Sequence, residues 1–164
     1  IPAEMKRVAK ALGGEVLREV SEEEFYKKIP ELRKEVGDRA ILRAIHFFDD
    51  NRVVDKEVAA LKSGDFETFK QCVIASGYSS AINLQNVFAV VNPQEQGLSL
   101  ALALIAKILG GKGAYRVHGG GFAGTVQAFV PLEKLDAFKA EMEAILGAGK
   151  CHILSIRPEG GAVL

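Results

Sequence analysis

Apolar residues recur every three or four positions through most of this chain, which predicts amphipathic helices. The longest apolar stripe begins after Gly37 and Asp38 and stops before Gly64. Glycine ends helices readily because it adopts the left-handed conformation of a C-cap. We therefore predict one long helix between these points. The side chains expected to face its core side are Ile41, Ile45, Phe48, Val54, Val58 and Leu61.

Two further helices flank the long one. Ser21 stands three residues before Glu24, a spacing typical of a capping box, and predicts a short helix that ends near Pro30. Asp65 directly follows Gly64 and is a good N-cap for the next helix, which should run to about Ser76. The side chains expected to point inward from that helix are Phe66, Phe69, Val73 and Ile74.

The second half of the chain predicts two more helices. Asn92-Pro93-Gln94-Glu95 combines a cap residue, a first-turn proline and an acidic third position, which is typical of a helix start. The stripe of this helix ends at Gly110, and another helix should cover residues 133–146. The inward residues are Leu98, Leu102, Ile105 and Leu109 in the former, and Leu135, Phe138, Met142 and Ile145 in the latter.

Three segments predict strands: residues 114–118, 125–130 and, near the end, 151–156. The first two flank a glycine-rich loop, and the third follows Gly147. Strands that alternate with helices in this way predict an α+β fold, with an antiparallel sheet covered by helices on one face. The charged first half should add extra N-terminal helices.

Composition narrows the class of protein. The 164 residues carry 21 basic and 21 acidic side chains, so the formal charge is zero, and this disfavours a nucleic-acid module. The longest apolar stretch, residues 98–106, is far short of the roughly 20 residues that span a bilayer. No basic and apolar leader opens the chain. Cys72 and Cys151 match no zinc spacing, so we expect reduced thiols in a cytoplasmic protein without membrane or nucleic-acid partners.

The loop at residues 118–124 is the strongest candidate for chemistry. It reads His118-Gly119-Gly120-Gly121-Phe122-Ala123-Gly124. Glycine loses more backbone entropy than other residues on folding, so four in six positions need a reason. One interpretation is a hairpin that requires positive φ angles. The other is a loop whose bare backbone approaches a ligand and offers amide donors to an anion.

Other polar residues leave two interpretations open. His118 either faces a substrate or phosphate beside the loop or is only a strand end. The hydroxyls of Ser76, Ser79 and Ser80 either mark a helix end or form the wall of a substrate cleft. His46 borders an apolar stripe, which favours a structural role, and Asp49-Asp50-Asn51 is interpreted as a solvated face. The spacing alone assembles no Ser-His-Asp set and no metal triad.

Several segments in order along the whole chain resemble one family. The glycine loop with its flank from Gly113 is similar to the third motif of the GHMP kinase superfamily, and more narrowly to the C-terminal domain of the galactokinase family. The segments that support the resemblance are Arg43 with His46, Arg52-Val53, Leu61-Lys62-Ser63-Gly64-Asp65-Phe66, Ser76-Gly77-Tyr78-Ser79-Ser80, Leu84-Gln85-Asn86-Val87, and Asn92-Pro93-Gln94-Glu95-Gln96-Gly97.

The resemblance implies a ferredoxin-like sheet and one domain, residues 1–164, of a two-domain sugar kinase. Such kinases use ATP and Mg²⁺ to phosphorylate the anomeric hydroxyl of galactose in a cleft between the domains. Residues Gly119, Gly120, Gly121, Phe122, Ala123 and Gly124 would line the phosphate side of that cleft. His118, Ser76, Ser79 and Ser80 would lie on the substrate side.

The sequence also departs from the family pattern. His118 stands where the family usually has Thr, Ala123 where it often has Gly, and Gly77 where it often has His. The sugar-recognition motif, the Ser-rich phosphate loop and the catalytic Asp and Arg belong to the N-terminal domain and are not in this chain. We therefore assign no catalytic residue, and expect the chain alone to be inactive and to self-associate through an exposed domain interface. The alternatives are a sugar- or nucleotide-sensing module and a free-standing interaction domain.

Overall fold

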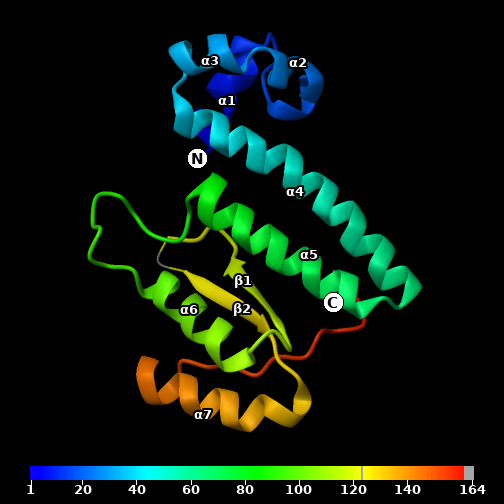
Figure 1. Cartoon of the computed structure of the whole chain (residues 1–164), viewed down its shortest axis with the longest axis vertical. Coiled ribbons are helices and arrows are strands. Elements are labelled where there is room, and N and C mark those ends of the chain that lie inside the picture. The colour runs from blue at the N-terminus through cyan, green and yellow to red at the C-terminus, as the bar shows by residue number, and fades with distance from the viewer. Residues whose placement is uncertain (123, 161–164) are drawn as a thin grey trace.

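The computed structural model describes residues 1–122 and 124–160. It is an α+β arrangement of helices around one antiparallel hairpin, which confirms the predicted class (Figure 1). The α-helices are α1 (Pro2–Ala11), α2 (Glu22–Lys27), α3 (Ile29–Glu35), α4 (Asp38–Ser63), α5 (Phe66–Ser79), α6 (Gly97–Leu109) and α7 (Leu135–Leu146). Short helical turns are η1 (Leu17–Glu19), the π-helical η2 (Ser80–Leu84) and η3 (Leu132–Lys134), and the strands are β1 (Ala114–His118) and β2 (Thr125–Phe129).

Local signals place most of the helix boundaries. The Ser21 hydroxyl accepts a hydrogen bond from the Glu24 amide at 3.3 Å, and the Asp65 carboxylate accepts one from the Thr68 amide at 3.0 Å. These bonds satisfy N–H groups that the first turn of a helix leaves unpaired. Gly64 ends α4 with a φ of 73°. Pro30, however, lies in the first turn of α3 rather than ending a helix, because the first turn tolerates a missing N–H.

The predicted start of α6 is wrong by several residues. The helix begins at Gly97 with Gln96 as its N-cap. The Asn92 and Glu95 amides instead donate to the carbonyls of Ala89 and Asn92, so this segment forms turns before the helix. Beyond that point Leu98, Ile105 and Leu109 are buried as predicted, with Leu102 half-buried.

The sheet has two strands in the described part of the chain, in the register Ala114↔Phe129 to His118↔Thr125. The predicted third strand at 151–156 does not form there. The Glu143 carboxylate instead accepts bonds from the amides of Gly149 and Cys151, which hold the start of this segment against α7. Its later residues are exposed, Leu154 by 88%.

The second-half helix α6 packs on one face of the hairpin, as predicted, and α5 of the first half packs on the other face. Phe129 of β2 contacts Phe69 of α5, with ring centroids 5.2 Å apart. Val126, three residues earlier on the same strand, packs instead with Leu98 of α6. Because side chains alternate across a strand, the hairpin lies between α5 and α6 (Figure 1).

The apolar core lies in two main parts, with a small third cluster formed by Val87, Leu98 and Val117. Helices α1, α2 and α3 gather around the N-terminal half of α4 at one end of the molecule (Figure 1). The second part joins α6, α7 and the hairpin. The buried members of the first part are Val8, Ala9, Leu17, Phe25, Leu32, Ala40, Ile41, Ala44 and Phe48; those of the second are Ala101, Ile105, Leu109, Phe138 and Met142.

Several residues predicted to face the core are exposed instead. The C-terminal half of the α4 stripe, Val54, Val58 and Leu61, is 49%, 45% and 56% exposed. The core formed with α1, α2 and α3 uses α4 residues only as far as Phe48, so these later side chains remain about half exposed. Phe66, Ile74 and Ile145 are likewise exposed.

Candidate functional site

The glycine loop joins β1 to β2 at one end of the hairpin. Gly119, Gly121 and Phe122 adopt positive φ angles of 66°, 77° and 62°. The interpretation of a hairpin that needs such angles is therefore correct. Phe122 is 41% exposed. Ala123 lies outside the described residues.

Asn86 is buried directly beneath this loop and forms hydrogen bonds with its backbone. Its carbonyl accepts a hydrogen bond from the Phe122 amide at 2.5 Å, and its side-chain amide donates to the Gly120 carbonyl at 3.5 Å. Asn86 is only 2% exposed. Asn86 belongs to one of the segments that resemble the family, but the sequence alone predicts no role for it. Its contact with the loop spans 34 residues of sequence, so no local pattern indicates it.

The serines predicted for the substrate side are buried. Ser76 is 1% exposed and donates a hydrogen bond to Asp50 of α4. Ser79 is 9% exposed, and its Oγ lies 2.9 Å from His46 Nδ1. These two hydroxyls face the α4–α5 interface rather than a cleft. Ser80 is 1% exposed, and its Oγ has no hydrogen-bond partner among the described residues.

The structure thus joins a serine, a histidine and an aspartate that sequence spacing did not. His46 Nε2 lies 3.9 Å from Asp50 Oδ2. Burial lowers the pKa of His46. The negative charge of Asp50 raises this pKa in part, and the positive charge of Arg116 on β1 lowers it further. The neutral imidazole and the Ser79 hydroxyl are both shielded, so the set bonds α4 to α5 and offers no accessible nucleophile. Asp50 is consequently part of this interface and not only a solvated face.

His118 is exposed where β1 enters the loop, paired in the ladder with Thr125. The structure therefore places His118 beside Gly119 to Gly121 but does not bring it to the same surface as the buried Ser76 and Ser79. Ser80 is linked to the loop indirectly, because its carbonyl accepts a bond from the Asn86 amide at 3.5 Å.

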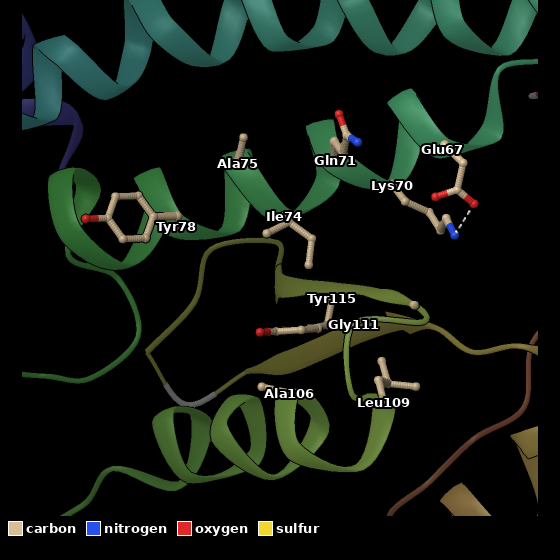
Figure 2. Close-up of a pocket in the computed structure, with 11 residues that line it drawn as sticks. Glu67, Lys70, Gln71, Ile74, Ala75, Tyr78, Ala106, Leu109, Gly111 and Tyr115 are labelled. Carbon is tan, nitrogen blue, oxygen red and sulfur yellow. Dashed lines mark ion pairs between the residues drawn. The ribbon is translucent and has the colours of Figure 1, made fainter.

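A groove of about 600 Å³ lies elsewhere, between α5 and α6 beside β1. Figure 2 shows Ile74 and Tyr78 on α5 above it, with Tyr115 of β1 between the helices. Lys70 and Glu67 form a 2.6 Å ion pair at one end. The lining is largely aliphatic and aromatic and contains no residue of the glycine loop.

Metal ligands do not cluster in the described ranges. No group of three or more His, Cys, Asp and Glu side chains is placed to hold an ion in residues 1–122 and 124–160. Over the same ranges, no helix combines the length and the apolar character that crossing a membrane requires.

Fold and loop together define a class: an α+β domain whose bare glycine hairpin, fixed on a buried asparagine, suits contact with an anionic group. No protein-family model matches the chain. Among curated proteins, it is 32% identical over 134 residues to a galactokinase of Haemophilus influenzae, covering 82% of this chain and 33% of that protein.

Other relatives agree. A galactokinase of Thermotoga neapolitana is 34% identical over 145 residues, which are 88% of this chain and 36% of that protein. One of Glaesserella parasuis is 32% identical over 136 residues, 83% of this chain and 33% of that protein. The chain spans about a third of the length of the curated relatives it matches. It is a galactokinase-related domain, and the resemblance predicted from the sequence is confirmed.

Proposed function

We propose that this chain is the C-terminal domain of a cytoplasmic galactokinase, in which the glycine loop faces the phosphates of ATP. One observation carries the proposal: in a chain related to galactokinases, Gly119, Gly120 and Phe122 of the loop are exposed, and the loop backbone is hydrogen-bonded to the buried Asn86. Phosphoryl transfer depends on positioning and on stabilising developing charge, which backbone amides beside the phosphates can do.

The residues present fit the phosphate groups better than the metal. The loop supplies backbone N–H groups, and Gly120 has open space around its Cα, so a ligand can approach closely. His118 adds an exposed ring beside the loop that can donate a hydrogen bond to a phosphate oxygen. In the complete enzyme, Mg²⁺ would be held by ATP and by residues of the N-terminal domain.

In the complete enzyme, ATP bound with Mg²⁺ would give its γ-phosphoryl group to the C1 hydroxyl of galactose. This chain would close one side of the cleft and orient the phosphates. The catalytic Asp and Arg would come from the N-terminal domain, as would most sugar recognition. The chain by itself would then lack the groups that activate the acceptor hydroxyl.

A coupled ADP-release assay with galactose tests this proposal. The protein from the complete reading frame should turn over, and the 164-residue chain alone should not. Normal turnover by the chain alone would contradict the assignment of catalysis to another domain. A complete protein that binds galactose or ATP but releases no ADP would instead favour the non-catalytic sensing module.

The loop's role is tested in the complete protein by Gly120→Asp. A carboxylate near the phosphates should lower kcat/KM for ATP by about tenfold or more through like-charge repulsion. The matched control is Gly120→Asn, which has nearly the same shape without the charge. Equal kinetics for the two variants would show that the loop does not face the nucleotide phosphates.

A further inference from the structure

Three successive residues of the glycine loop rest on Asn86. The Phe122 amide donates to the Asn86 carbonyl, and the Gly120 carbonyl accepts from the Asn86 side chain. Gly121 lies so close that a Cβ built on it would be 2.0 Å from the Asn86 carbonyl oxygen. This contact leaves no space for a side chain at position 121, so only glycine allows the loop backbone to lie this close to Asn86.

Asn86 is itself held firmly. Gln85 before it has a φ of 58°, and the Gln85 amide donates to the Ser80 carbonyl at 2.8 Å, which closes the π-helical turn η2. Two residues before Asn86, the Leu84 carbonyl accepts a hydrogen bond from Arg43 Nε of α4 at 3.1 Å. Arg43 is buried and forms an ion pair with Glu4 of α1. The segment that carries Asn86 is therefore held in place by α4, and through the Arg43–Glu4 ion pair by α1.

We propose that Asn86 is a positioning residue: it fixes the backbone conformation of residues 120–122 so that the loop meets the phosphate groups of the nucleotide. This rests on the proposed function, since the amides matter for catalysis only if the loop faces ATP. Asn86 does not touch substrate, because it is buried beneath the loop. Its effect on the reaction passes through residues 120–122.

Asn86→Asp tests the positioning with almost no change of shape. The carboxylate cannot donate to the Gly120 carbonyl and repels it. In the 164-residue chain, amide exchange at residues 119–122 should rise about tenfold relative to α6, the loss expected for one hydrogen bond. Lowering the pH until the new carboxyl is protonated should restore protection, because the acid O–H donates again.

The matched control is Asn83→Asp, three residues earlier, where the side-chain amide donates to Ser79 Oγ and not to the loop. It should leave loop exchange unchanged. If Asn86→Asp does not fold, Asn86→Ala removes the same donor without adding charge and takes its place. Unchanged loop exchange in a folded Asn86 variant, or a rise of equal size throughout the chain, would overturn the proposal.

Steady-state kinetics of the complete protein provide a second test of the positioning role of Asn86. Asn86→Asp should lower kcat while leaving the KM for galactose within about twofold, a split that simple loss of stability would not produce. A fall in kcat equal to that of Asn83→Asp would overturn the positioning role. If the wild-type protein shows no kinase activity, the proposed function fails, while the exchange experiment still decides whether Asn86 positions the loop.

Discussion

At the scale of single residues, the glycine loop contains positions of very different tolerance. Gly121 combines a φ of 77° with a contact that leaves no room for a Cβ, whereas Gly120 has no neighbouring atom within 4 Å of such a Cβ. The two glycines are adjacent in sequence and chemically identical. The positive φ of Gly121 and its close contact with Asn86 together make this glycine indispensable to the loop conformation.

Gly121→Ala should therefore destabilise the chain by about 2 kcal/mol or more, from the left-handed backbone and the steric clash together. Gly120→Ala should change the free energy of unfolding by less than about 0.5 kcal/mol. Urea unfolding followed by circular dichroism measures both. Similar midpoints for the two variants would contradict the close contact with Asn86.

At the scale of elements, polar side chains from the middle of α4 bond to hydroxyls in the last turn of α5. His46 and Asp50 on α4 meet Ser79 and Ser76 on α5. Buried polar groups of this kind are stable only when they are paired, and they specify how two helices face each other. The four residues therefore set the register of α5, which in turn carries the η2 turn leading to Asn86.

This interface should make stability depend on pH. Because burial lowers the pKa of His46 below its ordinary 6.5, the unfolded chain takes up the proton first as pH falls. The free energy of unfolding should thus be highest above pH 6.5 and should fall below it, by at most about 1.4 kcal/mol per pH unit, until folded His46 is protonated too. Urea midpoints between pH 7.5 and 5.5 measure this fall.

His46→Gln should reduce that pH dependence, since glutamine can bond Ser79 but does not titrate. His118→Gln is the control, because His118 is exposed at the end of β1 and makes no contact with the His46 cluster that the structure records. A pH profile that His46→Gln leaves unchanged would show that His46 is not the group responsible.

At the scale of the whole molecule, the two parts of the apolar core do not extend over the C-terminal half of α4. There Val54, Val58 and Leu61 form an exposed stripe at helical spacing. Contiguous exposed apolar residues favour association with another surface. Since the chain spans about a third of its relatives, the stripe is available to a further domain or to a second copy.

We therefore expect the 164-residue chain to self-associate at high concentration. Val58→Lys should weaken the association about tenfold, because a symmetric dimer would have to bury the new charge twice. Leu132→Lys is the control, since Leu132 lies on η3 and is 85% exposed. Sedimentation velocity measures the change, and a strictly monomeric wild-type chain would contradict the expectation.

The sequence by itself determined what depends on neighbours along the chain. Ser21 and Asp65 cap helices, Gly64 and Gly110 end them, and the loop from 118 joins two strands, because these features need only local backbone geometry. The family resemblance also came from the sequence alone. Each of these signals acts within a few residues, so burial elsewhere does not alter it.

Tertiary structure alone decided which side chains meet across distance. In the tertiary structure, Ser76 and Ser79 bond to side chains of α4, and residues 151–156 do not pair with the hairpin. The second half of the α4 stripe is exposed. It also placed Asn86 under a loop 34 residues away. Periodicity shows that a face is apolar or polar but not what covers it. The partner of each face depends on how the helices pack, which long-range contacts determine.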